Sequence, residues 1–316
     1  MGGMTGQSAS SPLLRIGSRG SPLALVQARA VQERLAKAGG LDPARIEIVV
    51  IRTIGDKIQD RPLAQAGGKG LFTKEIEEAL LEGVIDLAVH SSKDMATVLP
   101  AGLVLSAFLP REDPRDAFIG RRAKTLYDLP AGAVLGTASL RRQALARHWR
   151  PDLKVVPLRG NVETRLRKLE SGECDATILA LAGLKRLTLL DVATSILDID
   201  EFVPAVGQGA IGIETREDDT TTRTLAAAIN DADTATALAA ERAFLAVLEG
   251  SCRTPIAGHA RVDGERVRLR GLIAKTDGSA VLDVWRQDNR DEAARLGAEA
   301  GRDLKARAGT DFFVGG

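Results

Sequence analysis

The segment His90-Ser91-Ser92-Lys93-Asp94 places a base and an acid side by side, directly after an apolar run. Lys93 could bind a carboxylate of a substrate. Asp94 could stabilise a cation or move a proton, because a positioned carboxylate performs general acid–base catalysis. An exposed ion pair in a turn is the alternative interpretation, and this segment alone does not decide between the two.

A second group of candidate residues stands before the helix that is expected to begin at Pro22. Arg15 and Arg19 flank the end of an apolar run, and Ser21 is a hydroxyl cap followed by proline at the first helical position. The start of a helix attracts anions through its free N–H groups. The alternative is an ordinary cap beside solvated arginines.

The same arrangement recurs after Gly136, where Thr137 and Ser139 precede Arg141 and Arg142. Cations in the first turn of a helix oppose the helix dipole, which costs about 0.3–1 kcal/mol. An anionic ligand would relieve that cost, so the placement favours a binding function.

Three further arginines follow expected strands in the same way. Arg159 and Arg165 surround a Gly-Asn turn at the start of a helix, and Arg186 follows another apolar run. In α/β sheets, ligands bind beyond the carboxyl ends of the strands. We therefore expect these side chains to converge on one arginine-lined cleft.

Three other motifs contain residue types that occur in catalytic or nucleotide-binding sites. Cys252 lies in a Gly/Pro-containing loop where Arg253 would favour the thiolate, although an incidental cysteine is the alternative. The GGKG segment at 67–70 lacks the spacing of a phosphate-binding loop, so Lys69 is expected in a flexible loop. The segment 207–212 fits GxGxxG, but extended residues follow it where a dinucleotide site needs a helix.

The segments that must position these side chains alternate between strands and helices. The first unit is predicted to contain strands at 13–17, 45–53 and 86–90, with helices at 22–39 and 73–82. The second is predicted to contain strands at 134–137, 154–158 and 175–181, with helices at 139–147 and 161–169. Such alternation predicts mostly parallel sheets.

The remaining segments have a different pattern. Residues 201–215 are expected to be extended, and a helix at 235–248, strands at 267–274 and 281–286, and a helix at 291–308 follow. The fold class is therefore α/β, with two α/β units and a smaller C-terminal α+β unit.

Composition excludes several classes of function. The net charge is +1 and only 3% of the 316 residues are aromatic, which argues against a nucleic-acid binder with stacking platforms. No apolar run reaches the roughly 20 residues that span a bilayer, and the polar start lacks the features of a signal peptide. Two distant cysteines and three scattered histidines favour neither a disulfide framework nor a metal site. A cytoplasmic protein is expected.

Taken together, these segments resemble the porphobilinogen deaminase (hydroxymethylbilane synthase) family over nearly the whole chain. The matching pieces are RIGSRGSPLALVQA (15–28), GGKGLFTKEIE (67–77), HSSKDM (90–95), REDPRDAF (111–118), GTASLRRQ (136–143), LRGNVETRL (158–166), LAGLKRL (181–187), VPAVGQGAIGIE (203–214) and the Cys252 loop.

The resemblance implies a monomeric, cytoplasmic transferase of tetrapyrrole and heme biosynthesis. The first two domains would be similar to periplasmic binding proteins. We expect a discontinuous first domain at 12–109 plus 205–226, a second at 110–204, a C-terminal domain at 227–316 and a disordered tail at 1–11.

The family's reaction would join four porphobilinogen molecules, with loss of ammonia at each step, to a dipyrromethane cofactor held by a thioether at Cys252. Water would then release hydroxymethylbilane. The resemblance implies that Asp94 is catalytic, and that it stabilises positive charge on the pyrrole nitrogen or helps to protonate the leaving amine. The expected contacts to cofactor and substrate carboxylates are Arg19, Ser21, Lys93, Thr137, Ser139, Arg141, Arg142, Arg159, Arg165 and Arg186. Arg15 is a further candidate.

Two departures from the family pattern concern the loops of the expected cleft. Ala96 replaces a usual proline after the Lys-Asp pair, which would make that loop less rigid, and Ala138 replaces a common serine. The alternative function is a two-lobed binding protein for a small anion, without catalysis, which would leave Cys252 and the third unit without a role.

Overall fold

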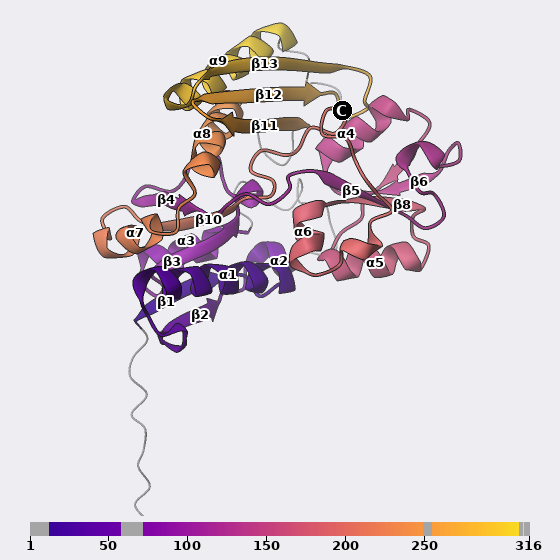
Figure 1. Cartoon of the computed structure of the whole chain (residues 1–316). Helices are drawn as coiled ribbons and strands as arrows, with labels where there is room; N and C mark the ends of the chain where they lie inside the picture. Colours follow the sequence, from indigo (N-terminus) through magenta and orange to yellow (C-terminus); the bar gives the residue numbers. More distant parts are fainter. Residues whose placement is uncertain (1–12, 58–71, 249–254, 310–311, 313–316) are drawn as a thin grey trace, which may run out of the picture.

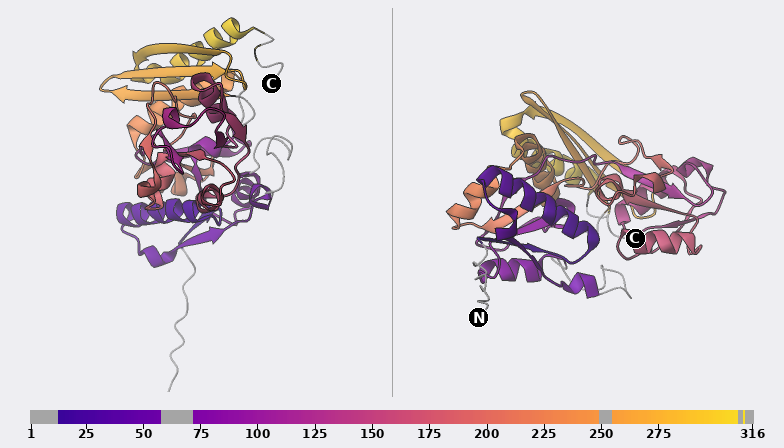
Figure 2. Two further views of the ribbon diagram at one scale, coloured as in Figure 1. Left: turned by 90° about the vertical axis from the view of Figure 1, so that its right-hand side faces the viewer. Right: turned by 60° about the horizontal axis from the view of Figure 1, so that its bottom comes forward.

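The structure is a computed structural model that describes residues 13–57, 72–248, 255–309 and 312. Lys69, Cys252 and the tail at 1–11 lie outside these residues. Two five-stranded sheets stand side by side, and a three-stranded sheet lies next to both of them (Figure 1). The further views in Figure 2 show the three-stranded sheet on one side of both α/β units.

The first sheet has the strand order β2-β1-β3-β10-β4, in which β10 runs antiparallel to its neighbours. Its strands are β1 (Leu14–Ser18), β2 (Ile46–Val50), β3 (Leu87–Ser91), β4 (Leu103–Phe108) and β10 (Ile211–Arg216). Its helices are α1 (Pro22–Gly39), α2 (Ile54–Lys57), α3 (Lys74–Leu81) and α7 (Thr220–Ala227). As predicted, Ser21 caps α1 by accepting a hydrogen bond from the backbone N–H of Ala24 at 3.3 Å.

The second sheet repeats this topology in the order β7-β6-β8-β5-β9. Its strands are β5 (Asp116–Gly120), β6 (Val134–Gly136), β7 (Lys154–Val156), β8 (Ala176–Ala180) and β9 (Ser195–Ile196). Its helices are α4 (Leu140–Trp149), α5 (Val162–Glu170) and α6 (Leu181–Arg186). In each sheet the antiparallel strand comes directly after a strand of the other sheet in the sequence. Strand β5 of the second sheet follows β4 of the first, and β10 of the first sheet follows β9 of the second. The chain therefore crosses twice between the units, which supports our proposal of a discontinuous first domain.

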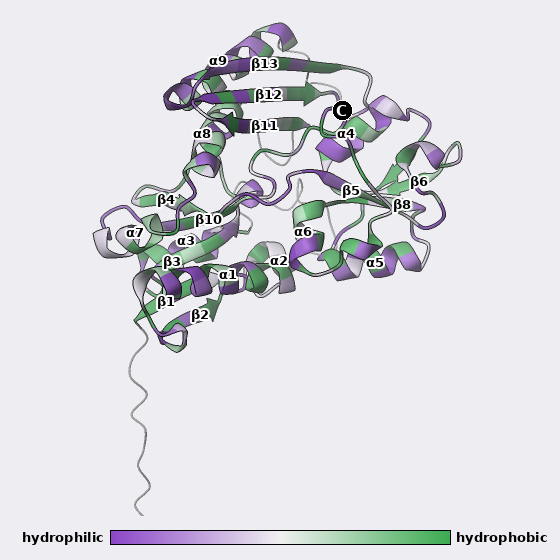
Figure 3. Ribbon diagram, in the orientation of Figure 1, coloured by the Kyte–Doolittle hydropathy of each residue, from purple (hydrophilic) through white to green (hydrophobic). Residues whose placement is uncertain are grey.

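The C-terminal unit is an antiparallel sheet of β11 (Ile256–Asp263), β12 (Arg266–Ala274) and β13 (Val281–Asn289), packed against α8 (Ala232–Val247) and α9 (Ala293–Ala308). The two helices approach closely at Gly297, where a Cβ atom would collide with the carbonyl oxygen of Ala240. Helices such as α1 and α5 carry both hydrophobic and hydrophilic residues (Figure 3), as expected for helices with one face on a core. The predicted fold class is confirmed.

Several predicted elements differ from the structure. Of the extended segment expected at 201–215, only the part within β10 is a strand, because Gly207 and Gly209 have φ values of +74° and +88° and form turns. The elements that the pattern missed are β4, β5, β9, β11, α2, α6 and α7. Every helix among the described residues is too short or too polar to span a lipid bilayer.

Glu241 on α8 ties the C-terminal unit to both crossings. It is fully buried and accepts hydrogen bonds from the guanidinium of Arg111, from the backbone N–H of Gly207 at 2.7 Å and from that of Ala260 at 2.7 Å. Removing one member of a buried ion pair typically costs about 3–5 kcal/mol. The three units are thus joined by a buried charged group as well as by apolar packing.

Candidate active site

A pocket in the first unit joins the carboxyl ends of β1 and β3. It is lined by Arg19 and Ser21, which follow β1, by Asp94, which follows β3, and by side chains that include Gln27, Phe72 and His90. The guanidinium carbon of Arg19 lies 4.2 Å from the centre of the Phe72 ring, a cation–π contact. The pocket therefore brings together three residues that the sequence predicted for one site.

Asp94 ends a single 3-10 turn, Ser92–Asp94, directly after the buried strand β3. The end of that strand is held from two sides. Gln27 on α1 donates from Nε2 to Ser91 Oγ at 2.9 Å, and His90 Nε2 lies 3.1 Å from Glu214 Oε2 on β10. The described residues provide no hydrogen-bond partner or ion pair for the half-buried Asp94 carboxylate, which is therefore open to a ligand in the pocket.

Arg141 and Arg142 share one buried counter-ion, Asp116 at the start of β5. Arg141 Nη2 lies 2.7 Å from Asp116 Oδ2, and Arg142 Nη2 lies 2.8 Å from Oδ1. Burial alone would raise the pKa of Asp116, but the charges of Arg141 and Arg142 outweigh it and hold that pKa well below its ordinary value of 3.8. Two positive charges thus face one negative charge, which leaves a net positive charge at the start of α4.

Cations from both α/β units lie close enough to perturb one another. Burial and repulsion from Arg142 lower the pKa of Lys93 from 10.5 to about 8, whereas Asp94 raises it. Burial, Arg142 and Arg159 lower the pKa of Arg165 from 12.5 to about 10, and Asp94 again opposes the shift. Such shifts through space require proximity. These shifts indicate that Lys93 of the first unit and Arg165 of the second lie near Asp94.

The hydroxyl groups predicted for the site organise the start of α4. Ser139 Oγ accepts a hydrogen bond from the backbone N–H of Arg142 at 3.4 Å, and Thr137 Oγ1 accepts one from that of Ser139 at 3.2 Å. Among the other predicted contacts, Arg165 Nε donates to the carbonyl of Gly160 at 2.9 Å. Arg186 instead lies at the crossing between the units, where its Nη2 donates to the carbonyl of Gly209 at 2.7 Å.

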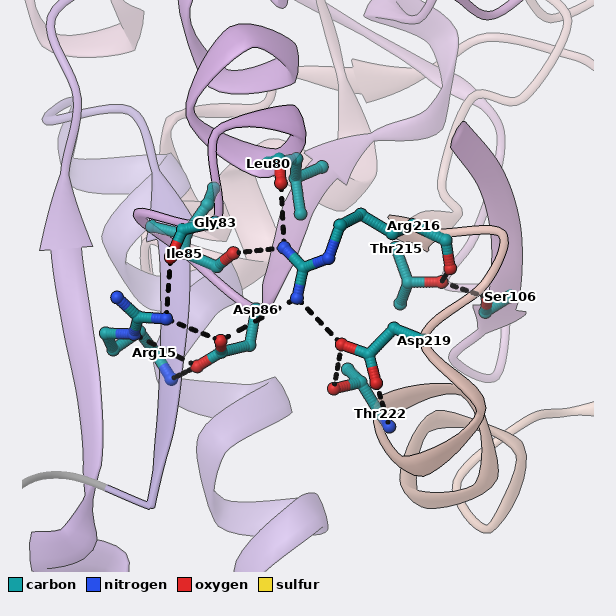
Figure 4. Close-up of polar contacts among 10 residues, drawn as sticks. All are labelled: Arg15, Leu80, Gly83, Ile85, Asp86, Ser106, Thr215, Arg216, Asp219 and Thr222. Atoms are coloured by element: carbon teal, nitrogen blue, oxygen red, sulfur yellow. Dashed lines mark hydrogen bonds and ion pairs between the residues drawn. The ribbon is translucent and has the colours of Figure 1, made fainter. Parts of the chain in front are cut away.

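Arg15 does not belong to this site, which corrects the expectation from the sequence. It lies near the start of β1, and its guanidinium pairs with Asp86 just before β3, with Nη2 2.7 Å from Oδ1 (Figure 4). The hydrogen bond to Asp86 raises the pKa of Arg15, although burial opposes the shift. Arg15 and Arg19 share one strand but flank its opposite ends, so only Arg19 reaches the pocket.

Sequence reasoning missed three residues that support the site. Asp116 neutralises part of the charge on Arg141 and Arg142, Glu214 holds His90, and Arg242 on α8 contacts the loop after Asp94. The sequence did contain a signal for Asp116, since it is a charged residue at the start of the otherwise apolar segment 116–119. Cys174, the other cysteine of the chain, is buried, and burial raises the pKa of its thiol.

In protein prepared without a cofactor, Lys93 is expected to titrate near pH 8, because burial and Arg142 disfavour its ammonium form. The native state then binds fewer protons than the unfolded state between about pH 8 and 10.5, so this group makes the fold more stable as the pH rises through that window. The pH dependence of acylation at the Lys93 peptide, followed by mass spectrometry, measures this pKa.

Lys93→Arg serves as the control for the acylation experiment, since it keeps the charge and removes the reactive amine. Binding of a polycarboxylate should move the midpoint to higher pH, because carboxylates favour the ammonium form. A midpoint at the ordinary value of 10.5 in the cofactor-free protein would contradict the prediction.

Comparison with known proteins identifies the family. A model described as porphobilinogen deaminase, dipyrromethane cofactor binding domain, matches residues 14–224, and the porphobilinogen deaminase C-terminal domain matches residues 235–306. Porphobilinogen deaminases from Nitrobacter hamburgensis and Nitrobacter winogradskyi are each 62% identical over 302 residues, which is 96% of this chain and 96% of each relative.

Solved structures with a similar fold include the methionine-binding protein MetQ, at 16% identity and a TM-score of 0.44, covering 68% of this chain and 88% of MetQ. Another is a VFT2 domain of Bordetella pertussis BvgS, at 16% identity and a TM-score of 0.41, covering 68% of this chain and 84% of that domain. The two family models and the two close relatives decide the assignment: the chain belongs to the porphobilinogen deaminase family, a family of transferases with a dipyrromethane cofactor.

Proposed function

We propose that this protein is a hydroxymethylbilane synthase, which adds four porphobilinogen units to a cysteine-linked dipyrromethane and releases a linear tetrapyrrole by hydrolysis. The observation that carries the proposal is that Lys93 of the first unit and Arg165 of the second both interact electrostatically with the carboxylate of Asp94, with Arg142 close to both cations. A site of this kind suits a ligand with many carboxylates that develops positive charge at one atom.

The donor set fits a dipyrromethane that carries acetate and propionate groups. Arg141 Nε is buried and has no hydrogen-bond acceptor among the described residues, and the pKa of Lys93 is lowered because burial and Arg142 leave its charge undercompensated. Arginine binds carboxylates through two parallel hydrogen bonds. We assign Arg19, Ser21, Lys93, Thr137, Ser139, Arg141 and Arg142 to the cofactor, Arg19, Ser21, Arg159, Arg165 and Arg186 to the substrate, and the covalent attachment to Cys252.

The residues of the proposed site then have two kinds of role, ligand binding and charge stabilisation. The cofactor, when bound, supplies the pyrrole carbon at which the chain grows. The cations of both units hold carboxylates and orient the pyrrole rings relative to Asp94. The Asp94 carboxylate stabilises the positive charge that develops on the pyrrole nitrogen when ammonia leaves, because a fixed charge needs little reorganisation during the reaction.

The intact mass of the purified protein tests the proposal together with product analysis. We expect the mass of a dipyrromethane in addition to that of the chain, located by peptide mapping on the peptide that contains Cys252. Incubation with porphobilinogen should yield ammonia and hydroxymethylbilane. An unmodified Cys252 in active protein would refute the attachment, and binding without release of ammonia would favour the two-lobed anion-binding protein instead.

A further inference from the structure

Arg242 connects the C-terminal unit to the loop that follows Asp94. It lies on α8, and its Nη2 donates hydrogen bonds to the carbonyl oxygens of Ala96 at 2.9 Å and Thr97 at 3.0 Å. The loop belongs to the first α/β unit, so these bonds cross between two units of the protein. They lie within three residues of Asp94 in the sequence.

Arg242 lies in buried surroundings that include a carboxylate, on a helix that packs against the first unit. Burial lowers the pKa of Arg242, and the carboxylate of Glu214 on β10 opposes that shift. Glu214 is the residue that holds His90 at the end of β3. On α8 itself, Leu238 packs with Phe108 and Ala210 of the first unit, so the helix that carries Arg242 is anchored beside the loop.

In the part of the chain that the structure describes, few backbone hydrogen bonds hold the chain beyond Ser92, whose N–H donates to the carbonyl of Ala210 at 3.0 Å. The 3-10 turn Ser92–Asp94 closes with one hydrogen bond, from the N–H of Met95 to the carbonyl of Ser92 at 3.3 Å. Single 3-10 turns have poorer hydrogen-bond geometry than α-helices. Residue 96, directly after this turn, is alanine, which leaves its φ angle unrestricted by a ring.

We propose that Arg242 is a positioning residue that holds the loop after Asp94 and thereby places the Asp94 carboxylate for the reaction. The proposal rests on the proposed function, since it assumes that Asp94 acts on the substrate. It also gives a role to the hydrogen bonds that Arg242 of the C-terminal unit donates to the first unit.

A backbone restraint at residue 96 provides a second way to hold the same loop. Met95 has φ −76° and ψ 148°, which is the conformation that a residue before proline prefers. The N–H of Ala96 donates no backbone hydrogen bond within the described residues, so proline would remove none there. Ala96→Pro should therefore fit the native loop and reduce its freedom in place of Arg242.

The experiment measures steady-state kinetics of cofactor-loaded Arg242→Met, in which the methionine keeps much of the apolar stem and removes the hydrogen-bond donors. We expect kcat to fall roughly 10- to 100-fold, because small misplacements of a catalytic group have effects of this size. The KM for porphobilinogen should stay within about twofold, since Arg242 does not line the pocket. Adding Ala96→Pro to Arg242→Met should restore most of kcat, with the single Ala96→Pro variant as the reference rate.

Arg216→Met is the matched control. Arg216 also donates to two backbone carbonyls, those of Leu80 at 2.7 Å and Ile85 at 2.8 Å, but it does so at the edge of the first sheet that carries Arg15 (Figure 4). Its loss should lower thermal stability without the selective fall in kcat. Intact mass confirms that each variant carries its cofactor, which separates positioning from cofactor assembly.

The outcomes separate this proposal from the proposed function. Unchanged kcat in loaded Arg242→Met, or no recovery of kcat when Ala96→Pro is added, would overturn the positioning role. An equal fall of kcat in Arg216→Met would also overturn it, because the effect would then be general destabilisation. If Asp94→Asn remained active, the proposed function of Asp94 would fail first, whatever the result for Arg242.

Discussion

Replacing Asp94 with asparagine is expected to reduce turnover by roughly 10²–10³-fold or more, while the protein still folds and carries its cofactor. Asparagine has nearly the same shape as aspartate, and the half-buried carboxylate makes no hydrogen bond within the described residues, so folding should change little. The neutral amide lacks the charge that would stabilise a cationic pyrrole. The kcat of cofactor-loaded protein, compared with its thermal unfolding, measures the effect.

A second readout comes from the cations beside Asp94. The carboxylate of Asp94 raises the pKa values of Lys93 and Arg165. In Asp94→Asn, the pKa of Lys93 should therefore fall below its value of about 8, which acylation of the Lys93 peptide can detect.

Asp113→Asn is the control for Asp94→Asn, because Asp113 pairs with Arg115 and does not line the pocket. It should keep most of the activity. Near-normal turnover of Asp94→Asn would remove Asp94 from the chemistry, and an unchanged pKa of Lys93 would show that the two groups do not interact as the structure indicates.

The sequence was sufficient to predict that Arg19, Ser21 and Asp94 line one pocket, because strand ends and helix caps are local features. Ser21, Ser139 and Asn161 each accept a hydrogen bond from the helix that they precede, as their positions predicted. The ends of parallel strands must then meet at one edge of a sheet, and so local patterns determined where Arg19 and Asp94 come together.

Contacts between residues far apart in the sequence could not be predicted in the same way. Arg15 resembles Arg19 in its local pattern, but the pairing of Ile16 with Leu87 places it beside Asp86 at the other end of the strands. Arg242 reaches the carbonyl of Ala96 from a residue 146 positions away. Which unit supplies the hydrogen-bond partner of a given loop depends on how the units pack against one another, and the local sequence around the loop does not contain that information.

Asp116→Asn is expected to lower the free energy of unfolding by about 3–5 kcal/mol, as is typical when one partner of a buried ion pair is removed. Asp116 is fully buried and receives hydrogen bonds from Arg141, from Arg142 and from Gln208 Nε2 at 2.9 Å. Asparagine would leave two buried guanidinium groups without a negative charge between them. Urea unfolding of wild-type and variant proteins measures the difference.

Asp152→Asn provides the matched control for Asp116→Asn, since Asp152 pairs with Arg150 in the same unit but is exposed, and exposed pairs contribute little to stability.

The comparison of cofactor-free and cofactor-loaded protein then tests the assignment of Arg141 and Arg142. If the positive charge of Arg141 and Arg142 that Asp116 does not neutralise faces cofactor carboxylates, the bound cofactor supplies negative charge in place of the charge that asparagine lacks. The decrease in the free energy of unfolding caused by Asp116→Asn should then be smaller in cofactor-loaded than in cofactor-free protein. Equal losses in both forms would argue that Arg141 and Arg142 serve the fold alone, whereas no loss in either form would mean that Asp116 does not compensate their charge.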